Sequence, residues 1–134
     1  MKKIFTLITI IMLGACTNLT KTERDQLHLL KSNGITVDRP VGNYEKPAAP
    51  AAAGLLNLLP GFGNFYLASG NGADSSHWIY GTGNLLLWPL SILWGVPEAV
   101  VDANNINERE LLYYYQYDQQ GKQELRNTGI KLYH

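Results

Sequence analysis

The sequence predicts a small, mainly α-helical domain whose main feature is an apolar helical hairpin interrupted by glycine and proline. Three observations predict it. The chain has 134 residues, which is room for one domain. A capping-box pattern near residue 20 precedes leucines at helical spacing. Two long apolar stretches, residues 55–68 and 78–96, are separated by a polar segment of turn type.

Composition excludes several classes of protein. The 11 Lys and Arg balance the 11 Asp and Glu, so the chain lacks the basic face of nucleic-acid binders, and we expect no nucleic-acid partner. A single cysteine cannot form an internal disulfide, and the three histidines are scattered without metal-ligand spacing. We therefore expect no metal site and no cofactor.

The N-terminus has the order of a secretory signal peptide, over residues 1–15. Lys2 and Lys3 precede an apolar run over residues 4–13, which is shorter than the roughly 20 residues that a membrane-spanning helix needs. The segment ends in Leu13, Gly14, Ala15 and Cys16. An ordinary signal peptide followed by a free thiol is one interpretation of this ending.

The same four residues resemble the lipobox of bacterial lipoproteins, in which a signal peptidase recognises the residues before the cysteine. The resemblance implies that Cys16 carries diacylglycerol in a thioether, that residues 1–15 are removed, and that membrane lipid is a partner. Several acyl chains anchor a protein stably. Thr17 stands where members kept in the inner membrane often carry Asp. The resemblance therefore implies the periplasmic leaflet of the cell outer membrane, with the inner membrane as the alternative.

The lipidated N-terminus and a short helix make up residues 16–37. Thr20 and Glu23 form the capping pattern, and Gly34 marks a stop, so we expect a helix over residues 21–33. Residues 38–53 are rich in Pro and Ala without helical period, which predicts an extended linker.

Residues 54–118 are expected to form the apolar hairpin and the helix after it. From residue 47 to 97 the only formally charged side chain is Asp74. Pro60 and Pro89 interrupt the two arms, and the paired glycines around them suit tight turns and close helix packing.

A helix is expected to start at Pro97, and a second capping pattern predicts a restart at Asn105. Residues 119–134 are expected to be a polar, less ordered C-terminal tail, with a short strand near Ile130.

Within the hairpin, short motifs occur at Gly61, Phe62 and Gly63, at Phe65 and Tyr66, and at Asp102. In this order they resemble the TM2-type membrane hairpin domain, which implies a two-pass module acting as a pore or signalling partner. Charge placement argues against two-pass insertion. With Cys16 in the periplasm, the loop over residues 69–77 would be cytoplasmic, yet it has no Lys or Arg whereas both flanks do, contrary to the positive-inside bias.

We instead expect the hairpin to pack into an apolar core or to lie at a membrane interface, where aromatic side chains suit the boundary between lipid and water. The expected membrane or partner contacts are Phe65, Tyr66, Trp78, Trp88 and Trp94.

Catalytic patterns are weak. Asp74, Ser75, Ser76 and His77 are triad residue types, but neighbours in sequence rarely reach triad geometry. Glu98 and Asp102 share a helical face and could serve a cation or proton, although capping and solvation explain them better.

We therefore expect a membrane-anchored envelope lipoprotein that is not an enzyme. Its structural, assembly or protein-interaction role would depend on the apolar hairpin, with a homo-oligomer or an envelope protein as candidate partners. The alternatives are the TM2-like module and, behind it, a small hydrolase centred on His77.

Overall fold

The computed structural model describes residues 18–70 and 75–132, which contain six helices. They are α2 (Lys21–Ser32), α3 (Pro50–Leu56), α4 (Phe62–Ser69), α5 (Ser76–Leu86), α6 (Ile92–Tyr117) and α7 (Gln119–Asn127). These residues include no strand, only an isolated bridge between Thr36 and Arg39. The prediction of a mainly α-helical protein is confirmed. The expected signal peptide, the lipobox and Cys16 lie outside the described residues.

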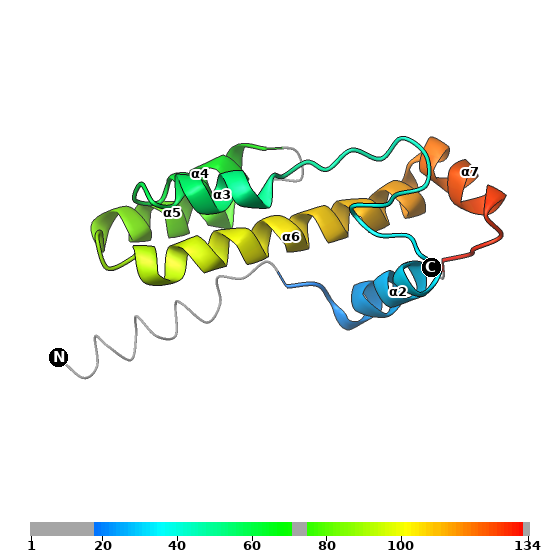
Figure 1. The fold of residues 1–134 in the computed structure, drawn as a ribbon, viewed down its shortest axis with the longest axis horizontal. Coiled ribbons are helices and arrows are strands. Elements are labelled where there is room, and N and C mark those ends of the chain that lie inside the picture. The colour runs from blue at the N-terminus through cyan, green and yellow to red at the C-terminus, as the bar shows by residue number, and fades with distance from the viewer. Residues whose placement is uncertain (1–17, 71–74, 133–134) are drawn as a thin grey trace.

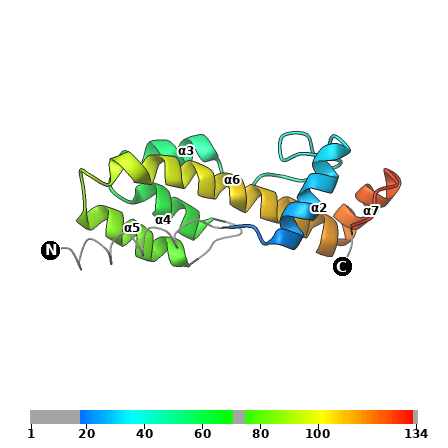
Figure 2. The same cartoon turned by 90° about the horizontal axis from the view of Figure 1, so that it is seen from below.

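Helix α6 runs along most of the molecule. Its 26 residues correspond to about 39 Å at 1.5 Å per residue. Helices α3, α4 and α5 lie along its N-terminal half, and α2 and α7 lie at its other half (Figures 1 and 2). The first group, with residues 92–101 of α6, is called the apolar end below. The second group, with residues 33–46 and the C-terminal half of α6, is called the charged end.

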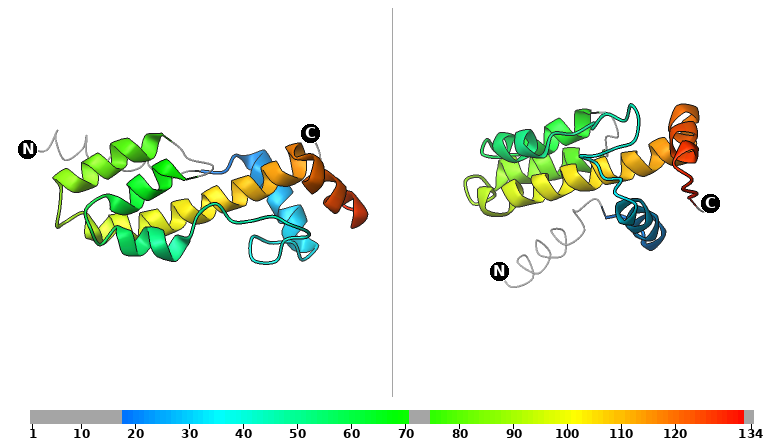
Figure 3. Two further views of the ribbon diagram at one scale, coloured as in Figure 1. Left: turned by 90° about the horizontal axis from the view of Figure 1, so that it is seen from above. Right: turned by 45° about the vertical axis from the view of Figure 1, so that its right-hand side comes forward.

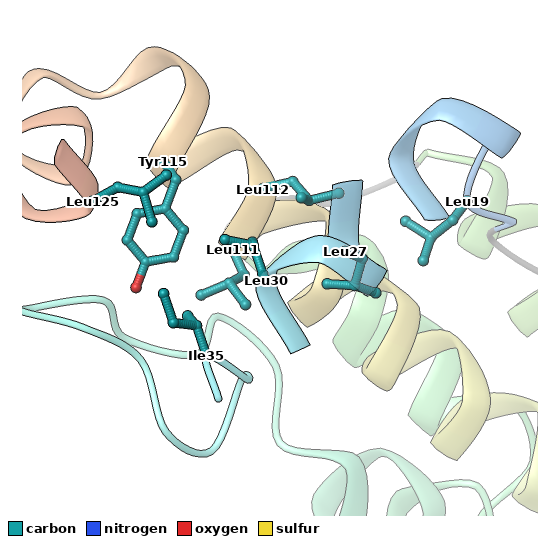
Figure 4. Packing of buried hydrophobic residues seen from close by; sticks show 8 residues of the cluster. All are labelled: Leu19, Leu27, Leu30, Ile35, Leu111, Leu112, Tyr115 and Leu125. Carbon is teal, nitrogen blue, oxygen red and sulfur yellow. The ribbon is translucent and has the colours of Figure 1, made fainter. Parts of the chain in front are cut away.

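The charged end has an ordinary aliphatic core. Figure 4 shows its buried side chains, which come from α2, α6, α7 and the segments beside α2. They are Leu19, Leu27, Leu30, Ile35, Leu111, Leu112, Tyr115 and Leu125. Burial of this kind stabilises by about 25 cal/mol for each Å² of apolar surface removed from water. Lys31 Nζ, 2.8 Å from Glu108 Oε1, joins α2 to α6 at the rim of this core.

Helix α2 begins and ends as the sequence predicts. The backbone N–H of Glu23 donates to Thr20 Oγ1 at 3.2 Å, and the backbone N–H of Thr20 donates to Glu23 Oε2 at 2.6 Å. Both bonds of the capping box are therefore formed. The helix ends at Ser32, and Gly34 follows with φ of 81°, a left-handed conformation that suits glycine.

The segment between α2 and α3 is irregular, but it is not a free spacer. The side-chain amide of Asn107 bonds both backbone groups of Ala48, accepting from its N–H at 2.9 Å and donating to its carbonyl at 2.8 Å. Tyr115 Oη makes the same double contact with Val41, at 2.8 and 3.0 Å. These bonds hold the segment against α6. The end of the expected linker, residues 50–53, is already helical, because Pro50 occupies the first turn of α3.

The apolar stretches break at their prolines, as predicted, but each arm then folds back on itself. Residues 57–61 turn the chain from α3 into α4, and residues 87–91 turn it from α5 into α6. Of the two expected forms, arms kinked or broken at proline, the structure has the broken one, so four helices pack together at this end (Figure 3). Gly61, with φ of 76°, provides the left-handed residue that the first turn requires.

The predicted helix boundaries at Pro97 and Asn105 are wrong. Helix α6 begins at Ile92 and passes through both residues without a break. Proline removes one backbone hydrogen bond, but α3 packs closely beside it, since a Cβ on Gly54 would lie 2.7 Å from Val100 Cγ2. Tertiary packing outweighs the lost bond.

The C-terminal segment is also more regular than expected. Asp118 Oδ1 accepts from the backbone N–H groups of Gln120 and Gly121, at 2.8 and 3.1 Å, and caps α7. Ile130 and Leu132 pack against the core of the charged end instead of forming a strand. The less ordered tail is thus corrected to a capped helix with a packed extension, as far as residue 132.

Candidate functional site

Large hydrophobic side chains are exposed almost entirely at the apolar end. Of the exposed large hydrophobics in the described residues, all but Tyr113 and Tyr117 lie between residues 55 and 101. They are Leu55, Leu58, Leu59, Phe62, Trp78, Ile79, Leu85, Leu86, Leu87, Trp88, Leu90, Leu93 and Val101. Leu86 and Leu93 are each 78% exposed. An apolar patch that covers the turns and outer faces of four helices marks an interaction surface.

The interior of the same end is polar. Three asparagines, from the ends or interiors of different helices, meet there: Asn57, Asn64 and Asn84 are all buried. Asn64 Oδ1 accepts from Asn57 Nδ2 and from Asn84 Nδ2, both at 3.0 Å. Buried polar groups need such partners, because an unmade bond costs the full desolvation of the group. The apolar end is therefore built with amides inside and leucines outside.

Two further contacts connect this network to α6. Asn57 Nδ2 also donates to the carbonyl of Gly95, and Asn84 Oδ1 accepts from Trp94 Nε1 at 2.9 Å. Asn57 Oδ1 accepts from the backbone N–H of Gly63 at 3.0 Å. One connected set of amides thus joins α3, α4, α5 and α6.

Glycine allows the four helices to approach closely. A Cβ on Gly63 would lie 2.2 Å from the carbonyl oxygen of Ala53, and one on Gly61 would lie 2.1 Å from that of Gly81. No heavy atom lies within 4 Å of a Cβ added to Gly83. The prediction that the glycines serve turns and close packing is confirmed for Gly61 and Gly63. At position 83, no neighbour in the described residues requires a glycine.

A histidine and a carboxylate face each other in the interior. His77 Nδ1 in α5 lies 3.9 Å from Asp102 Oδ2 in α6, and neither side chain has exposed surface. The hydrolase interpretation needs a base that a substrate can reach. His77 is enclosed and faces a carboxylate from another helix, and Asp74 lies outside the described residues.

Glu98 is one turn before Asp102 in α6 and is partly buried. Burial, and next the charge of Asp102, raise the pKa of Glu98 to about 7, while a hydrogen bond with Asn84 acts in the opposite direction. Glu98 and Asp102 therefore share a face of α6, as expected, but this face is turned toward the interior instead of being solvated. The described residues contain no group of three or more His, Cys, Asp or Glu placed to hold a metal ion.

The five predicted contact residues fall into two sets. Trp78 and Trp88 are exposed, by 52% and 56%, on the apolar surface. Phe65, Tyr66 and Trp94 are partly buried. The ring of Phe65 stacks beside Trp78 with centroids 5.3 Å apart, and Tyr66 Oη accepts from the backbone N–H of Ala49 at 3.1 Å.

Sequence reasoning missed the asparagine network and most of the exposed leucines. A signal was present: Asn57, Asn64 and Asn84 are isolated amides in otherwise apolar stretches. Where the outer surface of a group of helices is apolar, isolated amides of this kind lie in the interior between the helices. The leucines at residues 85–90 were not distinguishable from core residues, since sequence alone does not tell which face is covered.

The apolar end carries almost no formal charge on its described surface. In the described residues between Lys46 and Glu108, the only Asp, Glu, Lys or Arg are Glu98 and Asp102, one partly and one fully buried. Beyond this point α6 carries the partly exposed charges Glu108, Arg109 and Glu110, and Arg109 Nη2 donates to the carbonyl of Asn18 at 3.0 Å. The molecule is thus divided along α6 into an apolar and a charged half. Among the described helices, none combines the length and the apolar character needed to cross a membrane.

Comparison with known proteins gives no relative: neither a family model, nor a curated protein, nor a solved structure matches the chain.

Proposed function

We propose that the protein is a lipid-anchored component of the bacterial envelope, attached through Cys16 and acting by contact through its apolar end. In this proposal residues 1–15 direct export and are removed, and the mature protein lies at the periplasmic leaflet of the cell outer membrane. Its role is structural or in assembly, and it is not an enzyme.

The single observation that carries the contact role is the division of the molecule along α6. A protein that worked alone in water would place Leu86 and Leu93 inside and Asn64 outside. Here the order is reversed at one end and normal at the other. Such an arrangement supports a function in which the apolar end is covered by something other than water.

The anchor is supported by the sequence and by solvation energy. Each buried CH₂ of an acyl chain contributes about 0.8 kcal/mol, so two or more chains hold a protein stably to a bilayer. The only cysteine of the chain is at the lipobox position. No other cysteine competes for the modification.

Intact mass spectrometry of the protein from membranes tests the anchor. We expect a mature chain that begins at Cys16 and carries diacylglycerol and an amide-linked acyl chain, with metabolic palmitate label. Cys16→Ala should be unlabelled and retain residues 1–15, whereas Thr17→Ala should be labelled normally. An unlabelled wild-type chain with its leader attached would refute the proposal.

Fractionation tests the location. The wild-type protein should sediment with outer-membrane markers, and Thr17→Asp should shift it toward the inner-membrane fraction. If the wild-type protein is found in the inner-membrane fraction, the proposed outer-membrane location is refuted in favour of the inner membrane.

A further inference from the structure

We infer that the apolar end inserts into the hydrocarbon of a single lipid leaflet, the one that holds the acyl chains of Cys16, with the turn over residues 87–91 deepest. This inference rests on the proposed function and names the partner of the apolar end: acyl chains of membrane lipid.

The length of the apolar end fits one leaflet. Residues 92–101 of α6 correspond to about 15 Å, and the 11 residues of α5 to about 16 Å, at 1.5 Å per residue. The hydrocarbon core of a bilayer is about 30 Å thick. The exposed apolar surface thus extends for about half of that thickness, and ends where Asn104 and Asn105 begin the polar part of α6.

The first described residue, Asn18, lies near the level at which the apolar surface ends. Arg109 holds the carbonyl of Asn18, and Arg109 is four residues, or about 6 Å of helix, beyond Asn105. Cys16 precedes Asn18 by two residues, which span at most about 7 Å. The sulfur of Cys16 can therefore reach the level at which the apolar surface begins, so the acyl chains and the apolar end can enter the same leaflet.

The polar groups of this end suit a lipid environment. In hydrocarbon an unsatisfied polar group costs several kcal/mol, and here the asparagine amides bond one another across α3, α4 and α5, which leaves Asn64 Nδ2 as the one amide nitrogen of the three without a partner in the described residues. His77 and Asp102 are enclosed, and Glu98 is partly buried with its pKa raised. No Lys or Arg of the described residues lies between Lys46 and Arg109.

A second copy of the chain is the main competing occupant. It would cover part of the surface, but the exposed side chains come from all four helices of the end, α3, α4, α5 and α6, and from both turns. One flat interface between two copies covers one face, whereas acyl chains cover every side at once. The distribution of exposure around the end therefore favours lipid.

Trp78 and Trp88 provide a measure of depth in the protein itself. Trp78 lies near the start of α5, and Trp88 lies beyond its end, in the turn at the far end of the molecule. The eight helical steps from Trp78 to Leu86, the last residue of α5, separate them by about 12 Å along the helix. Insertion tip first places Trp88 among acyl chains and Trp78 near the headgroups.

The experiment uses the mature acylated protein in vesicles of phosphatidylethanolamine and phosphatidylglycerol. One variant keeps Trp88 through Trp78→Phe with Trp94→Phe, and its matched partner keeps Trp78 through Trp88→Phe with Trp94→Phe. Both lose the Trp94 contact with Asn84 equally. Fluorescence quenching is measured with lipids brominated at shallow or at deep chain positions. We expect deep bromines to quench Trp88 at least threefold more strongly than Trp78, and shallow bromines to show the reverse order.

A second pair tests the surface. In the variant that keeps Trp88, Leu86→Lys with Leu93→Lys should abolish deep quenching while the acyl chains still hold the protein on the vesicles. Tyr117→Lys, at an exposed position of the charged end, should leave the quenching unchanged.

The outcomes separate the inference from the proposed function. A protein that carries lipid at Cys16 but shows no deep quenching of Trp88 overturns the insertion and leaves the anchor. Concentration-dependent cross-linking with Trp88 shielded from lipid overturns it in favour of a second copy. Equal depth of both tryptophans overturns the tip-first orientation. A lipid-free protein with deeply quenched Trp88 supports insertion and refutes the anchor.

Discussion

His77 Nδ1 in α5 lies 3.9 Å from Asp102 Oδ2 in α6, and both side chains are fully buried. This pair links the two helices at the base of the apolar end, where the surface changes from apolar to polar. A buried pair of this type contributes little net stability, but removing one member leaves the other desolvated.

We therefore expect the two positions to be strongly coupled. His77→Leu should lower the free energy of unfolding by about 3 kcal/mol, because the buried Asp102 carboxylate loses its contact with His77. The double variant His77→Leu with Asp102→Leu should be more stable than the single one, since apolar residues of similar volume replace both groups. Urea unfolding of the detergent-solubilised protein measures both. Purely additive effects would contradict a direct interaction.

Glu98 predicts a pH dependence. Its pKa is raised from 4.5 to about 7, so the folded protein holds this proton more tightly than the unfolded chain. The stabilisation is complete below pH 4.5 and is lost as pH rises through 7. With a discount for partial exposure, we expect the free energy of unfolding to fall by about 1 kcal/mol between pH 4.5 and 8 from this group.

Glu98→Gln should remove that loss and be more stable than the wild type at pH 8. Glu45→Gln, at an exposed position, controls for the change in net charge. Thermal unfolding at pH 5 and pH 8 gives the comparison, and a Glu98→Gln protein with the wild-type pH profile would show that another group titrates.

Gly63 and Gly83 form a matched pair for close packing. Gly63→Ala would drive a methyl group against the Ala53 carbonyl, and we expect a loss of about 2 kcal/mol because α3 and α4 must separate. Gly83→Ala meets open space and should stabilise α5 by about 0.5 to 1 kcal/mol. The difference in unfolding midpoint between the two variants is the test, and equal midpoints would be inconsistent with this packing.

Asn107 holds the segment before α3 to the long helix. Asn107→Leu leaves both backbone groups of Ala48 without their partner, which should cost about 2 kcal/mol. Limited digestion with a glutamate-specific protease should then cut faster after Glu45, since both Arg39 and Lys46 are followed by proline and resist trypsin. Asn104→Leu, at an exposed position of α6, should alter neither property, and unchanged cleavage in the Asn107 variant would argue that other contacts hold the segment.

Local signals in the sequence were sufficient where a few neighbouring residues decide the structure. The bonds between Thr20 and Glu23 and the left-handed Gly34 depend only on the chain within one or two turns, so the limits of α2 follow from the sequence. The breaks at Pro60 and Pro89 follow for the same reason.

Other elements could not be predicted, because their outcome depends on distant partners. Pro97 and Asn105 have the properties of helix starts, yet α6 continues through them because α3 packs beside Val100. The polar residues after Gln119 look like a tail, yet Leu125 contributes to the core of the charged end.

By itself, the sequence determined the helical class, the position of the single cysteine behind an apolar run, and the near absence of charge from the middle of the chain. Only the tertiary structure decided that Asn57, Asn64 and Asn84 lie inside while Leu86 and Leu93 lie outside. Hydrophobicity says that a side chain avoids water. What covers that side chain depends on how closely the helix backbones approach each other. Glycines and amides that are far apart in the chain set this distance.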